Sequence, residues 1–121
     1  MKVLSSSVVI HVTDLQKAVN YYTDILGFTY DFKFGDYAGL VYDNVCIHLS
    51  GPANPGHKKV PGSAHLCVEC DEIDVYYDLI TARGAWIDTV LEDRPYGMRD
   101  CAVNDPDGNT IVFGKVIYVN V

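Results

Sequence analysis

The chain has 121 residues, of which 49% are hydrophobic and 21% are charged, a composition typical of one globular domain and unlike that of a disordered chain. No apolar run approaches the ~18–20 residues that a membrane-spanning helix needs, so we expect no membrane partner. The net charge of −7, without a cluster of Lys or Arg, argues against nucleic-acid binding; it serves solubility or favours a cationic ligand.

The N-terminal residues MKVLSSSVVIHV have one Lys and a broken apolar run, which favours a first strand over a signal peptide. Without a secretory signal, the four cysteines (Cys46, Cys67, Cys70 and Cys101) predict a reduced, cytoplasmic protein. Cys67 and Cys70 form a CxxC sequence inside a strand-like segment. Because residues three apart in a strand point to opposite faces, we discount it as a redox or zinc motif.

The first half of the chain predicts one strand, one helix and three further strands. Residues 7–15 are rich in β-branched side chains and end at a helix cap, Thr13 or Asp14. Three strand-like runs follow the helix at residues 28–34, 37–42 and 45–49. Between them, apolar side chains recur at helical spacing until Gly27 ends the pattern: Leu15, Val19, Tyr22, Ile25 and Leu26.

The second half repeats this order. Residues 65–71 predict a strand, the following helix ends at Gly84, and strand-like runs occupy residues 85–91, 99–103 and 110–113. The buried stripe of that helix is Ile73, Tyr76, Tyr77 and Ile80. We predict an α+β fold, a single domain over residues 1–121. Two βαβββ modules (1–50 and 63–121), joined by a Gly/Pro-rich linker (51–62), curl their sheets into an open cup with the helices outside.

Strand alternation separates an apolar face, which must pack under the helices, from a mixed face. The apolar sets are Val8, Ile10 and Val12; Val45, Ile47 and Leu49; Ala64, Leu66 and Val68; and Ile111 and Phe113. The mixed sets are Ser7, Val9 and His11; Cys46, His48 and Ser50; His65, Cys67 and Glu69; and Thr110, Val112 and Gly114. The mixed face predicts either a ligand or metal site or a solvated surface.

Aromatic residues follow the same sheets. Alternation places one set on a single face of the second strand, where it can stack on a planar ligand, form core or make a dimer contact: Phe28, Tyr30, Phe32 and Phe34. Tyr37, Tyr42, Trp86 and Tyr96 lie in strands and loops nearby. The stretch DPDGN at residues 105–109 has turn chemistry, and we assign it no catalytic role.

Three features resemble the vicinal oxygen chelate superfamily, which includes glyoxalase I, extradiol dioxygenases and bleomycin-resistance proteins. They are the paired βαβββ units, the run from Val12 to Phe28 (VTDL…YYTDILGF) and DPDGN before the last strand. In metal-dependent members, two strand positions per module hold the metal. The resemblance places them at Ser7, His48, His65 and Val112.

Val112 has no lone pair, and Ser7 offers only a hydroxyl, whereas a divalent ion usually takes three or more protein ligands. Cys46 and Cys67 lie ~7 Å along their strands from the histidines and would serve only a displaced site. We therefore expect no cofactor, and a divalent metal, if present, would use His48 and His65.

The segment from Arg94 to Asn109 is similar to the bleomycin-resistance branch, although Cys101 and Tyr96 stand where that branch commonly has a bulky aromatic and a Trp. The resemblance implies a metal-independent homodimer that sequesters an amphipathic or cationic small molecule in a dimer groove. The predicted ligand-binding residues are Phe32, Phe34, Tyr37, Tyr42, His48, His65, Trp86, Tyr96 and Arg99. The alternatives are a divalent-metal lyase or dioxygenase that uses His48 and His65, and a protein–protein module.

Overall fold

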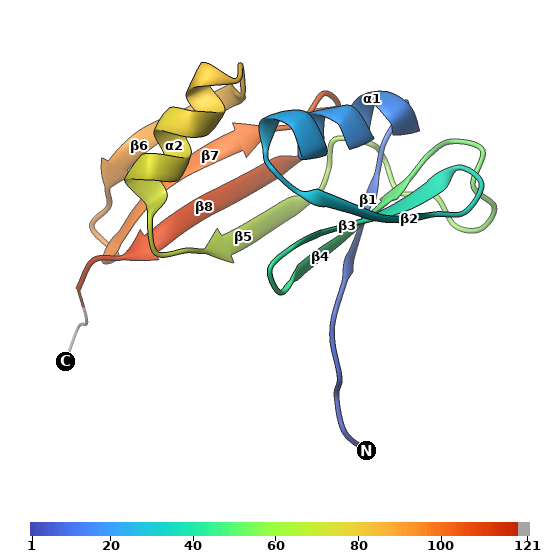
Figure 1. Cartoon of the computed structure of the whole chain (residues 1–121), viewed down its shortest axis with the longest axis horizontal. Helices are drawn as coiled ribbons and strands as arrows, with labels where there is room; N and C mark the ends of the chain where they lie inside the picture. The colour runs from blue at the N-terminus through green and yellow to red at the C-terminus, as the bar shows by residue number, and fades with distance from the viewer. Residues whose placement is uncertain (119–121) are drawn as a thin grey trace. The chain divides into compact units, whose positions relative to one another are not determined.

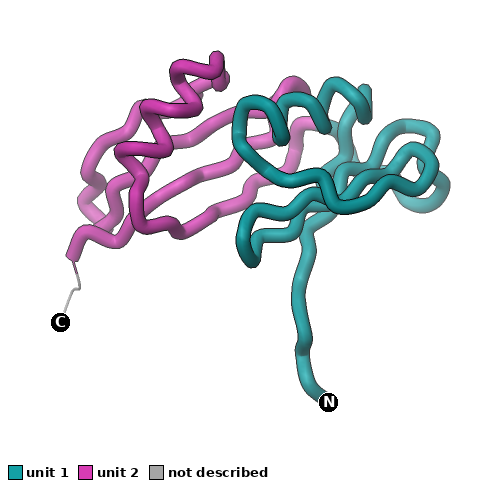
Figure 2. The backbone as a smooth tube through the Cα atoms, in the orientation of Figure 1, with its two compact units in different colours: residues 1–61 teal, residues 62–121 magenta. Residues whose placement is uncertain are grey.

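The computed structural model describes residues 1–118 and divides them into two compact units at Pro61 and Gly62 (Figure 2). The sequence predicts modules 1–50 and 63–121 with a linker between them. In the structure, the linker residues up to Pro61 belong to the first unit. Each unit contains one mixed four-stranded sheet and one α-helix, which confirms the α+β fold class (Figure 1).

The first unit follows the predicted βαβββ order. Its elements are β1 (Val8–His11), α1 (Leu15–Asn20), a π-helical segment η1 (Tyr21–Ile25), β2 (Thr29–Lys33), β3 (Tyr37–Tyr42) and β4 (Val45–Ser50). The strands lie in the order β1-β4-β3-β2, and β1 runs parallel to β4 whereas the other pairs are antiparallel. The parallel pair requires a crossover, which α1 and the strands after it supply.

Helix α1 begins where the sequence predicts. The Asp14 carboxylate accepts a hydrogen bond from the Lys17 backbone N–H at 3.1 Å, which caps the first turn. The helix then widens into η1, where the Leu26 N–H donates to the Tyr21 carbonyl at 3.2 Å, and Gly27 (φ 85°) ends it. Tyr22 and Leu26 are fully buried against the sheet, as the apolar pattern predicts.

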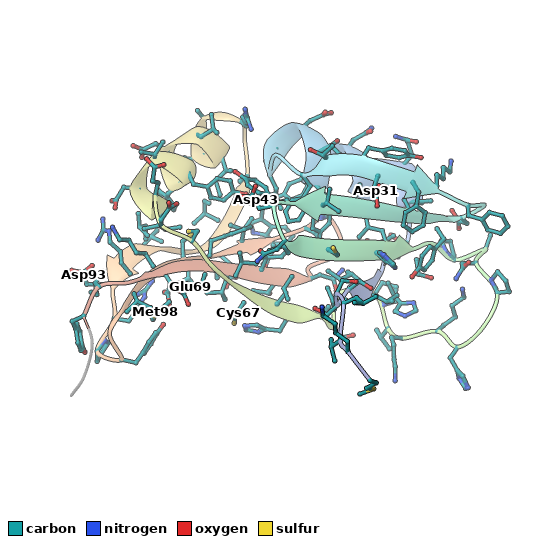
Figure 3. The ribbon with its side chains drawn as sticks, turned by 60° about the horizontal axis from the view of Figure 1, so that its bottom comes forward. Asp31, Asp43, Cys67, Glu69, Asp93 and Met98 are labelled. Atoms are coloured by element: carbon teal, nitrogen blue, oxygen red, sulfur yellow. The ribbon has the colours of Figure 1, made fainter. Side chains whose placement is uncertain are left out.

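A β-bulge in β2 changes one prediction. Tyr30 pairs with Leu40 whereas Phe32 pairs with Gly39, so the extra residue, Asp31 (labelled in Figure 3), breaks the alternation. Leu40 is fully buried. Tyr30 therefore shares its face with core residues and Phe32 points to the opposite face, so the predicted single-face ladder of aromatics is wrong.

The second unit repeats the order. Its elements are β5 (His65–Glu69), α2 (Ile73–Ala82), β6 (Trp86–Asp93), β7 (Met98–Asn104) and β8 (Thr110–Val116). The strands lie in the order β5-β8-β7-β6, with β5 parallel to β8. Helix α2 lies along one face of this sheet (Figure 1). The Tyr76 ring packs on Phe113 with 4.8 Å between centroids, and Ile73 and Ile80 are fully buried.

The predicted burial of the apolar faces is confirmed at the centre of the sheets, whereas Val8, Val45, Ala64, Leu66 and Val68 are only partly buried. Ile10, Ile47, Leu49 and Ile111 are at most 1% exposed, whereas Val9 on the other face of β1 is 44% exposed. The face of each sheet opposite its helix is called the open face below. Among residues 1–118, no helix is long and apolar enough to cross a membrane.

Candidate functional site

The open face of the second sheet carries a hollow of about 460 Å³, which is within the size range of small-molecule sites. Residues from all four strands and from the β6–β7 turn line it: His65, Asp88, Thr89, Arg94, Tyr96, Asp100, Cys101, Ala102, Thr110 and Val112. Two of the predicted ligand-binding residues, His65 and Tyr96, are among them. The lining combines an aromatic ring, hydroxyls, an imidazole and carboxylates, so it can stack on a ligand and orient it through hydrogen bonds.

One wall of the hollow is held by a charge network around Asp100. The Asp100 carboxylate is largely buried, and it accepts hydrogen bonds from Arg94 Nε at 2.9 Å and from the Tyr96 hydroxyl at 2.5 Å. Arg94 also forms an ion pair with Glu92 at 3.1 Å. Tyr96 as a residue is 67% exposed, although its hydroxyl is held by Asp100. The turn therefore presents an aromatic surface at a fixed place.

The same network perturbs the titration of its members. The hydrogen bond to Asp100, followed by partial burial and the Asp100 charge, raises the pKa of the Tyr96 phenol. The hydrogen bond to Asp100 likewise raises the pKa of the Arg94 guanidinium. Tyr96 thus stays protonated as a donor, and Arg94 stays charged as its neighbour.

The floor of the hollow follows the strand register. His65 pairs with Thr110, and Cys67 pairs with Val112. The Thr110 hydroxyl donates to Asn104 Oδ1 at 2.9 Å. Figure 3 shows Cys67 and Glu69 on the side of β5 that faces away from α2. Val112 thus lies on the predicted open face, where it contributes an apolar floor.

Asp88 is the exposed carboxylate of the hollow. Asn104 Nδ2 and the Thr89 hydroxyl donate to it, both at 3.3 Å, and the described residues offer it only such neutral partners. Asp100, by contrast, is neutralised by Arg94. Asp88 therefore leaves a negative charge available to a cationic ligand.

The open face of the first sheet carries an aromatic cluster of Phe32, Tyr37 and His48. The Tyr37 hydroxyl lies 2.8 Å from His48 Nδ1, and the Phe32 ring meets the imidazole edge-on with 5.2 Å between centroids. The Phe32 ring lies against Gly39, where a Cβ atom would overlap it. Burial raises the pKa of the Tyr37 phenol.

The structure places the remaining predicted residues outside both groups, although Trp86 lies beside the hollow. Phe34 is 84% exposed after β2. Tyr42 is on the helix-side face and packs edge-on against Phe28 at 5.5 Å. Trp86 is 53% exposed on β6, in register with Asn104 on the open face. Arg99 points toward α2, where it binds Asp74 at 2.7 Å, and it also binds Asp93 of β6 at 3.1 Å.

Five polar residues of the hollow were not among the predicted site residues: Asp88, Thr89, Arg94, Asp100 and Thr110. Alternation along β7 would have placed Asp100, rather than Arg99, on the open face. Asp88 carries no such signal, because β6 has register shifts between Ile87 and Glu92. A bulge of this kind has no reliable mark in a single sequence.

The donors present do not fit a divalent metal. Val112 lies on the floor of the hollow and supplies no lone pair, and β1 pairs Val9 rather than Ser7 with His48. Within residues 1–118, no group of three or more His, Cys, Asp or Glu side chains is arranged to hold a metal ion.

Paired βαβββ units, each with a mixed sheet and one open face, define a class of α+β proteins. The chain belongs to the Glyoxalase/Bleomycin resistance protein/Dioxygenase superfamily, whose family model matches residues 5–113. Bleomycin resistance proteins of Geobacillus stearothermophilus and Staphylococcus aureus are 31% identical to it over 129 residues, with coverage of 94% of this chain and 98% of theirs.

Solved structures share the fold. The bleomycin-binding protein of Streptomyces verticillus, solved with copper(II)-bleomycin, is 28% identical with a TM-score of 0.76, covering 93% of this chain and 96% of that one. TioX from Micromonospora sp. ML1 has a TM-score of 0.81 at 23% identity, covering 93% and 98%. Membership of the superfamily is thus established by sequence. The likeness to TioX, at 23% identity, bears on the fold alone.

Proposed function

We propose that this chain binds a bulky, cationic antibiotic of the bleomycin type and holds it without changing it chemically. The observation that carries the proposal is the hollow on the second sheet, in which a fixed Tyr96 ring stands with the Asp88 carboxylate. Stacking on the ring and attraction to the carboxylate suit a ligand that is both planar and positively charged. The named bleomycin resistance relatives support this ligand class.

A metal-dependent lyase or dioxygenase has less support, since Val112 on the floor of the hollow supplies no lone pair. The donor set described above does not fit a divalent ion, so no observation favours the enzyme hypothesis. His65 remains in the proposal as a polar contact for the ligand. We further propose a homodimer, for which sedimentation should give about twice the chain mass of 13.4 kDa.

The four cysteines agree with the cytoplasmic location that the sequence predicts. All four are free in the structure. A reducing compartment keeps thiols in this state. We therefore propose that the protein meets its ligand inside the cell.

The proposal is tested by titrating metal-free bleomycin into the protein while the fluorescence of Trp86, the single Trp, is recorded. Saturable binding is expected. The Asp88→Asn variant should bind about fivefold more weakly, as expected for the loss of about 1 kcal/mol from one exposed charge pair.

The matched control is Asp78→Asn, which removes the same charge from an exposed residue of α2, the helix on the other face of this unit. Binding by Asp78→Asn should equal that of the unmodified chain. Equal weakening by both variants would show a general charge effect and would reject the hollow as the site. A chain that shows no saturable binding would reject the ligand class.

A further inference from the structure

We propose that Tyr118 is a positioning residue for the hollow: it holds the backbone on both sides of Tyr96, so that the Tyr96 ring stays where a ligand can stack on it. The segment from Val116 to Tyr118 thereby acts as a strap across the β6–β7 turn. Tyr118 is not among the residues that line the hollow. Its role rests on the proposed function, because it concerns the same aromatic wall.

The strap continues from the end of β8. Val116, the last residue of β8, pairs with Met98, the first residue of β7, so β8 ends beside the β6–β7 turn (Figure 1). The next N–H group, that of Ile117, donates to the Gly97 carbonyl at 3.1 Å. This bond extends the antiparallel pairing by one step into the turn. The backbone of the strap is therefore attached to the residue that follows Tyr96.

The Tyr118 side chain also holds the residue that precedes Tyr96. Its hydroxyl donates to the Pro95 carbonyl at 2.6 Å. Its ring lies over Gly97, where a Cβ atom would come within 3.1 Å of the ring atom Cζ. The ring can approach the backbone this closely because glycine has no side chain, and glycine also tolerates the φ of 86° at this position. Tyr118 thus contacts both neighbours of Tyr96.

These contacts matter because Tyr96 itself is held by the tip of its side chain. Tyr96 is 67% exposed, and its hydroxyl donates to Asp100. A ring that is held only at its hydroxyl can still move with the turn that carries it. The two contacts of Tyr118 restrict that movement. A binding surface that is already fixed loses less conformational entropy when a ligand binds, so the strap should strengthen binding.

The strap is tested in the ligand-free protein through the alkaline titration of Tyr96. The hydrogen bond to Asp100 raises the pKa of the Tyr96 phenol, so a looser turn should weaken that bond and lower the midpoint. Tyr118→Phe removes the bond to Pro95, and Tyr118→Ala removes the ring as well. We expect a lower midpoint in both variants, with the larger change in Tyr118→Ala. Each midpoint is taken from the difference in phenolate absorbance between a variant and the same variant carrying Tyr96→Phe.

The consequence for the hollow is measured by titrating metal-free bleomycin. Tyr96→Ala should weaken binding about fivefold, the contribution of one aromatic contact. Tyr118→Ala should weaken binding roughly two- to fivefold, because it loosens the same contact without removing it. In a chain that already carries Tyr96→Ala, Tyr118→Ala should have no further effect. An equal loss in both backgrounds would show that Tyr118 does not act through the Tyr96 ring, and would overturn the proposal.

The matched control is Tyr30→Ala, because Tyr30 is 48% exposed and Tyr118 is 49% exposed. It should change neither the Tyr96 midpoint nor bleomycin binding, and urea unfolding checks that every variant is folded. A Tyr96 midpoint that is the same in Tyr118→Ala and in the unmodified chain would also overturn the proposal. If the unmodified chain binds no bleomycin, the proposed function fails, and the titration still decides whether Tyr118 holds the turn.

Discussion

Asn109 shows how a single side chain can join distant segments of one unit. Its Oδ1 accepts hydrogen bonds from the backbone N–H groups of Gly62 and Ala64 at 3.1 and 3.0 Å, and its Nδ2 donates to Asp105 at 2.9 Å. The side chain is 1% exposed. The DPDGN turn, predicted from sequence as turn chemistry, thus also secures the chain that leads into β5.

Asn109→Ala should therefore destabilise the protein by about 2–3 kcal/mol, because it leaves the part-buried N–H groups of Gly62 and Ala64 without their acceptor and removes one donor from the buried Asp105 carboxylate. Urea unfolding measures the change. Gln16→Ala, at an exposed position of α1, should change the free energy of unfolding by less than about 0.5 kcal/mol. Equal unfolding midpoints for the two variants would show that the turn does not depend on the amide.

The cysteines should differ sharply in reactivity because their burial differs. Cys67 is exposed on the open face of β5, whereas Cys101 is 1% exposed and burial raises the pKa of its thiol to about 11. At about pH 8 an aromatic disulfide reagent should label Cys67 rapidly and Cys101 only after unfolding, since the thiolate is the reactive form. Cys67→Ser should abolish the fast phase, and its loss in Cys101→Ser instead would contradict this assignment.

At the scale of the element, the β6–β7 turn is ordered by side chains as well as by its own backbone, in which the Arg94 N–H donates to the Met98 carbonyl at 2.7 Å. Arg94 and Tyr96 converge on Asp100 across the turn, and Gly97 adopts φ 86° between them. A Cβ atom at Gly97 would also come within 3.1 Å of the Tyr118 ring. The aromatic wall of the hollow therefore depends on the Asp100 carboxylate.

The alkaline titration of Tyr96 tests this dependence. Because the folded state raises the pKa of the phenol, the Tyr96–Asp100 bond contributes stability below the usual tyrosine range, near pH 10, and loses it as pH rises through the raised value. The difference in phenolate absorbance between the unmodified chain and Tyr96→Phe isolates this group. Asp100→Asn should move its midpoint to lower pH, and an unchanged midpoint would show that the bond is absent in solution.

Regular strands explain what the sequence could predict. In β4 and β8 the alternation is unbroken, so the buried Ile47 and Ile111 and the open-face positions of His48 and Val112 follow from sequence. Bulges in β2 and β6 break the two-residue alternation of side chains. Tyr30 and Phe32 therefore lie on opposite faces, and the place of Asp88 in the hollow could not be predicted. Arg99 was assigned to the site, but two aspartates hold it on the helix side.

At the scale of the whole molecule, the chain repeats one βαβββ plan with different chemistry on each open face. The first unit presents an aromatic and imidazole cluster, and the second presents a hollow with Asp88 and the Tyr96 ring. The net charge of −7 adds a general attraction for cations. This division supports a binding protein in which each unit contributes its own kind of contact.

The most direct test of binding without turnover is to incubate excess protein with metal-free bleomycin, remove the protein by denaturation and analyse the drug by chromatography and mass spectrometry. Calorimetry of the same mixture gives the stoichiometry. We predict saturable binding at a fixed ratio and complete recovery of unmodified drug. Recovery of a covalently changed drug, at a rate that scales with protein concentration, would contradict the account and identify the chain as an enzyme.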